Sequence, residues 1–317
     1  SNLVGTNVRI DLLIEFLDPE NLPRAAIISA IDQAMYDILA KHEGMSLCNM
    51  LGQKRDKVEL YANINRRTKD RSPASFATSA CVAIEAGFRA VKIAPFDEVE
   101  PDIASLKLAE PGLARISDVK DALSPSVKLF VDCHWRFSPA VAMELIRPLS
   151  VLGVTWYECP ILETEENIPY LRRLRKAAND AGMVLAGLEK GIGSKVFETF
   201  AHGGAYDVMM PDIKYIGGLA NMMETAKILN RYGVAVSPHN PTGPVCHVAS
   251  LAVCGSLPNV GLLELQFDET HYFSKLVGEN IETPTQGSVR LPTENGLGVM
   301  LERAVLQELP YVMVNVT

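Results

Sequence analysis

The sequence lacks the features of a membrane protein, a secreted protein or a disulfide-rich one. None of its apolar runs reaches the roughly 20 residues that a membrane-spanning helix needs, and the chain does not open with a basic segment followed by an apolar one. The six cysteines form no CxxC pair and no framework spacing; they stand at positions 48, 81, 133, 159, 246 and 254. We therefore expect a cytoplasmic protein with free thiols and no membrane partner.

Basic residues are also fewer than acidic ones. The 317 residues include 30 Lys and Arg against 38 Asp and Glu, so the formal net charge is −8. This balance argues against nucleic acid or an anionic membrane surface as a partner. One basic cluster, RRTKDR at 66–71, is short and has no aromatic residues between its charges. We interpret it as a solvated or anion-binding loop, because a nucleic-acid surface would need interleaved aromatic side chains.

What the sequence does contain is a regular alternation of short apolar runs and longer amphipathic stretches. Eight runs predict strands: 58–64, 89–95, 127–133, 154–159, 184–189, 206–211, 234–238 and 261–266. Most are continuously apolar, as is typical of parallel strands that are buried on both faces. Helical patterns lie between them, and several end at a glycine shortly before the next strand, at Gly87, Gly153, Gly182 and Gly233.

Eight strands joined by helices favour a closed (β/α)7β barrel of the TIM type over an open doubly wound α/β sheet. We assign residues 57–279 to this barrel. The flanks do not follow the same rhythm, because residues 24–45 are strongly helical and the chain ends on an extended run at 311–316. Residues 1–56 and 280–317 are therefore predicted to form a smaller α+β capping domain built from both termini.

Ionisable residues at the ends of the predicted strands decide between the two folds. They are Asp132 with His134, Glu158, Glu189, Asp212, His239 and Glu264. Burying so many titratable groups at equivalent positions is costly unless they converge on a cation or a substrate. In a barrel the C-terminal ends of the strands meet in one mouth, where catalytic residues gather. We therefore expect these side chains to form one site.

Three carboxylates of this set, Asp132, Glu158 and Glu189, end successive strands. Each of them alone would be interpreted as a capping or ion-pairing acid. Together they offer hard oxygen ligands on rigid strands, with positions open for water and substrate, and this combination suits Mg²⁺. The sequence therefore predicts a magnesium site.

Two histidines complete the predicted site. Asp212 and His239 end the next two strands, and a carboxylate beside an imidazole raises its basicity, which prepares a proton-abstracting base. His134 lies two residues after Asp132, so alternation along an extended chain points both side chains the same way. The remaining histidines are interpreted as core or surface residues: His42, His202, His247 and His271.

Seven segments carry a resemblance to a known family. They are SAIDQAMYDILAKHEG (29–44), VKIAPFDEV (91–99), VDCHWRF (131–137), YECP (157–160), GLEK (187–190), MMPDIKYIGG (209–218) and SPHNPTGPVCHVASL (237–251). In these segments the sequence is similar to the enolase superfamily, in its mandelate racemase-like subgroup, and most of all to members of the galactonate dehydratase type. The resemblance covers nearly all of the predicted barrel and the helix before it, and the spacing of the acids and histidines makes it specific.

The resemblance implies a TIM-like barrel and a Mg²⁺-dependent dehydratase. The substrate would be a sugar acid, an aldonic acid such as galactonate, and the product a 2-keto-3-deoxy acid. Removal of the proton next to the substrate carboxylate would give an enediolate, whose charge the cation would stabilise. Relatives are commonly homo-oligomers, so the same is expected here.

The resemblance also implies roles for the residues of the predicted site. The three carboxylates that end successive strands would bind Mg²⁺. His239, oriented by Asp212, would remove the α-proton, and His134 would donate a proton to the departing β-hydroxyl. Glu264 would hydrogen-bond the substrate carboxylate, and further substrate-binding residues would be Lys92 and Asn63.

The chain departs from the family pattern in three places. Relatives often carry Lys-x-Lys on the second strand, where this chain has Lys92, Ile93 and Ala94, so a second lysine base is absent. Cys159 stands where a second glutamate usually follows the metal ligand, which would alter the surroundings of the cation. The N-terminal region is short, so the cap is expected to be incomplete, with stretches absent near residues 4–7 and 22–26.

Two other functions stay open. A racemase or epimerase of a hydroxy acid could use His134 as its second base, although the missing lysine makes a two-base proton transfer less favourable. A catalytically silent, sugar-acid-binding relative is compatible with Cys159 and the missing lysine. The intact pair of Asp212 and His239 argues against a silent protein.

Overall fold

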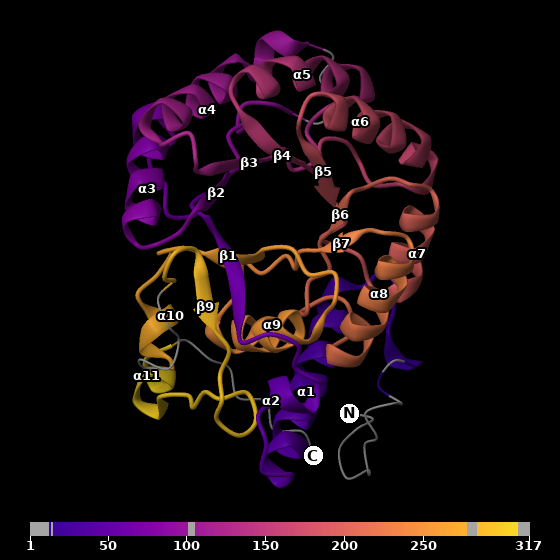
Figure 1. The fold of residues 1–317 in the computed structure, drawn as a ribbon, viewed down its shortest axis with the longest axis vertical. Helices are drawn as coiled ribbons and strands as arrows, with labels where there is room; N and C mark the ends of the chain where they lie inside the picture. Colours follow the sequence, from indigo (N-terminus) through magenta and orange to yellow (C-terminus); the bar gives the residue numbers. More distant parts are fainter. Residues whose placement is uncertain (1–12, 14, 101–104, 278–283, 310–317) are drawn as a thin grey trace.

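The computed structural model describes residue 13 and residues 15–100, 105–277 and 284–309, and a closed ring of parallel strands lies at its centre (Figure 1). The strands follow the predicted runs: β1 (Lys57–Asn63), β2 (Ala90–Ile93), β3 (Lys128–Asp132), β4 (Val154–Glu158), β5 (Val184–Gly187), β6 (Val208–Met209), β7 (Ala235–Val236) and β8 (Leu263–Gln266). Their order is β7-β6-β5-β4-β3-β2-β1-β8, with parallel pairing throughout. Two backbone hydrogen bonds close the ring, from Val236 N to Asn259 O (2.9 Å) and from Gly261 N to Val236 O (2.7 Å). The predicted (β/α)7β barrel is confirmed.

Helices surround the strands and connect each one to the next (Figure 1). They are α3 (Pro73–Glu85), α4 (Glu110–Ala122), α5 (Pro139–Val151), α6 (Ile168–Asp180), α7 (Ser194–His202), α8 (Leu219–Arg231) and α9 (Pro244–Ser256), with the 3-10 turns η2 (Leu106–Ala109) and η3 (Glu165–Asn167) before α4 and α6. Serine side chains cap the starts of α3 and α5 by accepting a hydrogen bond from the first turn, at Ser72 and Ser138. The four predicted glycines that follow helices have positive φ values of 68–101°, which a residue with a β-carbon adopts only at a cost.

Aromatic side chains fill the interior of the barrel below the acids. Phe130 and Trp156 stack with ring centroids 4.9 Å apart, and Tyr61 packs edge-on against Phe130 at 5.3 Å. Side chains two residues apart on a strand point to the same face, so Asp132 and Glu158 lie one layer above these rings, at the C-terminal ends of β3 and β4. The acids therefore lie above an apolar floor, where charge interactions are weakly screened.

The N-terminal and C-terminal segments of the described chain contact each other beside the barrel (Figure 1). The elements there are α1 (Leu22–His42), α2 (Leu47–Met50), α10 (Tyr272–Lys275), β9 (Ser288–Arg290) and α11 (Arg303–Glu308). β9 pairs antiparallel with β1, and the amide of Leu47 donates to Gly296 O (2.7 Å) while that of Leu297 donates to Asp37 Oδ1 (2.8 Å). The smaller α+β unit is thus built from both terminal segments. Its exact boundaries and the expected homo-oligomer stay predictions.

Some expectations fall on residues that are not described. These are the extended run at 311–316 and the stretch near 4–7. Residues 22–26, the second expected gap, form the first turn of α1, which Asn21 caps by accepting a hydrogen bond from Arg24 N (3.0 Å). Within the described ranges, every helix is too short or too polar to cross a bilayer.

The basic cluster at 66–71 lies beside acidic side chains. Three of its arginines form ion pairs: Arg66 with Glu269 (3.3 Å), Arg67 with Asp268 (3.1 Å) and Arg71 with Asp97 (2.6 Å). Acidic side chains of the protein therefore offset much of its positive charge, and the solvated or anion-binding loop stays a prediction.

A buried histidine on α9 leads to a prediction of pH-dependent stability. His247 is fully buried, and Asn240 Nδ2 lies 2.9 Å from its Nδ1. Burial lowers the pKa of His247 from 6.5 to about 4. Between these values the unfolded chain binds a proton that the folded protein does not, so stability is lost as the pH falls from about 6.5 to 4. A shift of this size corresponds to a few kcal/mol of unfolding free energy.

The comparison is urea unfolding at pH 7.5 and pH 4.5 for the native chain and for His247→Asn. The asparagine keeps an acceptor near the position of Nδ1 but does not titrate, so its stability is expected to fall less with acid. Equal losses in both proteins would show that His247 does not carry this pH dependence.

Candidate functional site

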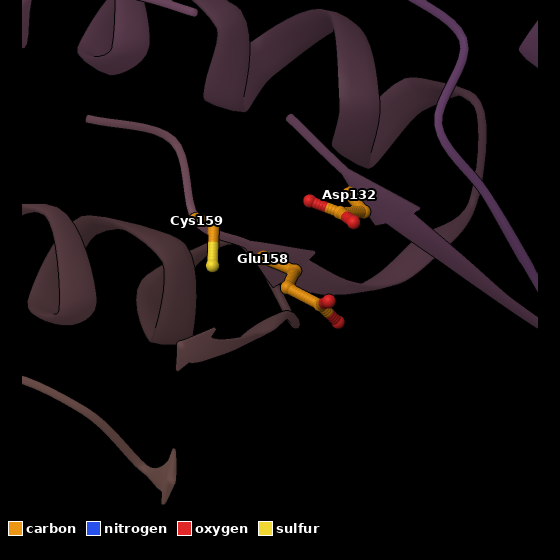
Figure 2. A group of neighbouring side chains, drawn as sticks. All are labelled: Asp132, Glu158 and Cys159. Atoms are coloured by element: carbon orange, nitrogen blue, oxygen red, sulfur yellow. The ribbon is translucent and has the colours of Figure 1, made fainter. Parts of the chain in front are cut away.

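Asp132 and Glu158 are the last residues of β3 and β4 and are direct partners in the register of the two strands. Their side chains are 4% and 0% exposed. A ligand atom of each lies within 4.8 Å of the other and of the thiol of Cys159 (Figure 2). Two of the three predicted metal ligands are therefore adjacent, and the structure adds a thiol that the sequence did not place among the ligands.

Lys92 on β2 is buried beneath the acids and bridges two of them. Its Nζ lies 2.6 Å from Glu158 Oε1 and 3.1 Å from Glu264 Oε1, and its side chain is 1% exposed. Burial disfavours the charged ammonium, but the two carboxylates outweigh this effect and keep the pKa of Lys92 well above its ordinary value. The predicted substrate-binding lysine is thus also the internal counter-ion of the site.

The Lys92→Met variant is expected to be strongly destabilised. Removing one partner of a buried ion pair leaves uncompensated charge behind, which costs about 3–5 kcal/mol of unfolding free energy. The matched control is Lys176→Met, because Lys176 forms an exposed pair with Asp180 on α6 at 2.6 Å, and such pairs contribute little. Urea denaturation of both variants checks this. Equal, small effects would contradict the counter-ion role of Lys92.

Glu264 on β8 accepts hydrogen bonds from several donors. Besides Lys92, Asn63 Nδ2 donates to Oε1 (2.6 Å) and the amide of Asn240 donates to Oε2 (2.9 Å). Burial alone would raise its pKa, but the charges of Lys92 and His239 and these hydrogen bonds lower it overall. An ionised carboxylate can only accept hydrogen bonds. The side chains that donate to it are Lys92 and Asn63.

His239 and Asp212 form the pair that the sequence predicts. The Nδ1 atom of His239 lies 2.9 Å from Oδ2 of the fully buried Asp212, whose Oδ1 accepts a hydrogen bond from Lys214 N (2.7 Å). The opposite ring nitrogen, Nε2, lies 3.4 Å from Glu189 Oε2. Burial lowers the pKa of an imidazole, yet Glu189, Asp212 and Glu264 together raise that of His239 to about 10. Asp212 therefore fixes the orientation of the ring, and the uncompensated charges of Glu189 and Glu264 favour its protonated form.

His134 lies across the mouth from His239. β3 and β7 are four positions apart in the ring of eight strands, so their ends face each other. His134 Nε2 lies 2.9 Å from Asp132 Oδ2, and its backbone amide donates to Oδ1 of the same residue (2.9 Å). The charge of Asp132 raises the pKa of this imidazole, although burial opposes it. The protonated form is thus favoured, as a proton donor requires.

The oxygens of Asp132 and Glu158 fit a divalent cation, whereas Glu189, the third predicted ligand, lies outside the group whose ligand atoms are within 4.8 Å of one another. Glu189 is 5% exposed, and its Oε2 has no hydrogen-bond partner. Burial raises the pKa of Glu189, and it raises that of Glu158 to about 8 even though Lys92 opposes the shift. A cation would favour the ionised forms of both groups. Burial also raises the pKa of the Cys159 thiol well above its ordinary value, so the oxygens, and not the sulfur, suit a hard ion.

Several contacts at the site were not predicted. Trp156 Nε1 donates to Glu158 Oε2 (2.6 Å), and alternation along β4 could have indicated this, because the two residues share a face. Asn240 follows His239 directly, but nothing in its surroundings in the sequence signals its contact with Glu264. Glu163, a half-buried acid in the loop after β4, had no signal either.

Comparisons with known proteins agree with this arrangement. The Enolase C-terminal domain-like family matches residues 75–305. D-gluconate dehydratase of Thermoproteus tenax is 30% identical over 298 residues, which are 93% of this chain and 58% of that protein. D-xylonate dehydratase of Haloferax volcanii is 26% identical over 95% of this chain and 75% of its own length. The chain thus spans little more than half of the first relative and three quarters of the second.

Solved structures share the fold. A member of the enolase superfamily from Salmonella Typhimurium superposes with a TM-score of 0.83 at 22% identity, over 96% of this chain and 83% of that one. A mandelate racemase/muconate lactonizing enzyme from Jannaschia sp. CCS1 gives a TM-score of 0.82 at 24% identity, over 94% and 77% of the two chains. The matched family covers most of the barrel, with the two acids that end β3 and β4 and the Glu189 that follows β5. The chain therefore belongs to the Enolase C-terminal domain-like family, within the enolase superfamily and its mandelate racemase-like subgroup.

Proposed function

We propose that this chain is a Mg²⁺-dependent dehydratase that converts a sugar acid, a galactonate-like aldonic acid, into a 2-keto-3-deoxy acid through an enediolate. The observation that carries this proposal is the placement of two histidines on opposite sides of a carboxylate cluster. His239 follows β7 and His134 follows β3. Loss of water needs a base at the α-carbon and an acid at the β-hydroxyl, and two facing imidazoles provide both.

His239 is the proposed base, and its ring must be neutral before the substrate reacts. A cation held by Glu189 would offset the negative charge that raises the pKa of this imidazole. Its Nε2 faces into the mouth because Nδ1 is engaged by Asp212 at 2.9 Å. The buried Asp212 orients the ring and stabilises the imidazolium that forms when the α-proton is taken. The proton therefore moves from the α-carbon of the substrate to Nε2 of His239.

His134 is the proposed acid. Its contact with Asp132 favours the protonated ring, and its side chain is 39% exposed, so it can reach a substrate in the mouth. It gives its proton to the departing β-hydroxyl, which leaves as water. The resulting enol becomes the 2-keto-3-deoxy acid.

Asp132, Glu158 and Glu189 are the proposed ligands of Mg²⁺. When bound, the cation supplies positive charge where negative charge develops on the substrate carboxylate. Lys92 and Asn63 are the proposed donors to that carboxylate, and Glu264 holds both of them in place through contacts of 3.1 Å and 2.6 Å.

The names of the relatives support the substrate class but do not single out one sugar. They include dehydratases of D-gluconate, D-xylonate and, in Verminephrobacter eiseniae, D-galactonate. All three substrates are aldonic acids. We therefore propose the class first and galactonate only as its first member to test.

The test is a screen of the Mg²⁺-loaded protein against aldonic and aldaric acids, with semicarbazide to detect keto acid. Keto acid from one or more aldonic acids is the expected result, and the stereochemistry of the hits identifies the sugar. No keto acid from any of them, with Mg²⁺ shown to be bound, would contradict the dehydratase.

A racemase or epimerase is the second candidate, and the facing histidines favour it as well. In that reaction His134 would act as a base on the other face of the α-carbon. Incorporation of solvent deuterium at the α-carbon without keto acid would select this function.

A further inference from the structure

Three neighbouring strand ends at the site share an unusual backbone conformation. His134 after β3, Cys159 after β4 and Leu188 after β5 have positive φ values of 48°, 44° and 70°. Residues with a β-carbon rarely adopt this left-handed region, and they persist there only where their surroundings hold them. Each of the three is within two residues of a proposed metal ligand. These turns therefore orient the proposed metal ligands, and contacts with neighbouring residues must stabilise their backbone conformation.

One carboxylate contacts all three turns. Glu163, in the loop between β4 and α6, accepts hydrogen bonds from Trp135 Nε1 (2.8 Å), next to His134, and from the backbone amide of Leu188 (2.5 Å). The thiol of Cys159 lies 3.7 Å from the same carboxylate. Leu188 lies 25 residues after Glu163 in the sequence, and Trp135 lies 28 residues before it. Glu163 thus links the ends of β3, β4 and β5.

The fold leaves a specific space for this carboxylate. Ala186 on β5 faces the interior cluster of the barrel, so the next residue, Gly187, faces outward. A β-carbon at Gly187 would lie 2.4 Å from Glu163 Oε1 and 2.8 Å from the hydroxyl of Tyr206. Tyr206 donates its own hydrogen bond to Glu163 (2.8 Å). The carboxylate therefore lies behind the strands, outside the mouth, and is surrounded by donors.

From this geometry we infer that Glu163 is a positioning residue: it fixes the three turns so that the acids of the site are in place before a cation or substrate arrives. It touches neither group. The inference rests on the proposed function only in assuming that the three acids bind a divalent cation. Partners behind metal ligands typically affect metal affinity about 10- to 100-fold.

The test is the Glu163→Gln variant, which keeps the volume of the side chain. An amide has one oxygen, so whichever way it turns, its NH₂ group faces a donor, either the indole of Trp135 or the amide of Leu188. We expect the dissociation constant for Mg²⁺, measured by calorimetry on the metal-free protein, to rise about 10- to 100-fold. We also expect faster hydrogen exchange at the amide of Leu188.

Tyr206→Phe is the matched control. It removes one hydrogen bond from the same carboxylate but leaves the contacts to the three turns, so the Mg²⁺ dissociation constant should stay within about twofold of the native value. Each variant is measured at the same interval below its own melting temperature, which removes a general effect of stability. If Glu163→Gln does not fold, Trp135→Phe tests the contact to β3 alone and should weaken Mg²⁺ binding in the same direction.

The outcomes separate this inference from the proposed function. A folded Glu163→Gln protein with native Mg²⁺ affinity and native exchange at Leu188 would overturn the positioning role. Equal weakening by Tyr206→Phe would overturn it too, because the effect would then be general. If the native chain binds no divalent cation, the proposed function fails, while faster exchange at Leu188 in Glu163→Gln would still support the fixing of the turn.

Discussion

The His239→Asn variant is expected to lose both exchange of the substrate α-proton with solvent and dehydration, each by at least about 100-fold. The His134→Asn variant is expected to lose dehydration to a similar extent but to keep exchange. The reason is the order of events, since proton removal by His239 precedes departure of the hydroxyl. Asparagine suits both positions: at 239 it can still contact Asp212, and at 134 it tolerates the left-handed φ of 48°.

The measurement is NMR of the substrate in deuterated water, followed in parallel with keto acid formation. His202→Asn is the control, because His202 lies at the exposed end of α7 and should leave both rates unchanged. If both active-site variants lost exchange equally, the division of labour between the two histidines would be wrong. If His134→Asn kept full dehydration, another group would have to be the acid.

The barrel could be predicted because its strands are buried on both faces and are therefore recognisable in the sequence as apolar runs. The predicted lengths were less accurate: the runs at 206–211 and 234–238 contain strands of only two residues, β6 and β7. After these strands the backbone is no longer paired with a neighbouring strand, and Asp212 and His239 lie in these unpaired segments. β9 was not predicted, because the three residues Ser288–Arg290 carry no strand pattern and owe their conformation to pairing with β1.

The members of the site and the pair of Asp212 and His239 could be predicted from position, but the other contacts could not. Equivalent strand ends must meet in a barrel, which is enough to gather Asp132, Glu158 and His239. The bridge from Lys92 to two carboxylates depends on strand register and side-chain reach, which a single sequence does not contain. Glu163 is the clearest case, because its contacts join loops through space, and an acid in a loop is ordinarily a solvated residue.

Glu189→Gln is expected to abolish Mg²⁺ binding without loss of stability. The Oε2 atom of Glu189 has no hydrogen-bond partner, and burial raises the pKa of this group, so a neutral amide relieves a cost of burying charge. Within the described residues it forms one ion contact, with His239 Nε2 at 3.4 Å. Glu158→Gln differs, because it breaks the 2.6 Å pair with Lys92 and should lower stability together with Mg²⁺ affinity.

The prediction is checked by calorimetry with Mg²⁺ and by thermal unfolding of the metal-free proteins. We expect the Mg²⁺ affinity of Glu189→Gln to fall beyond detection and its melting temperature to equal or exceed that of the native chain. Chelation of the native protein should likewise remove keto acid formation, and added Mg²⁺ should restore it. Glu198→Gln on the exposed face of α7 is the control and should change neither quantity. Native Mg²⁺ affinity in Glu189→Gln would exclude this residue as a ligand. A large loss of stability would instead show that Glu189 stabilises the fold. Substitution of a residue whose role is binding is expected to weaken Mg²⁺ binding and leave the fold intact.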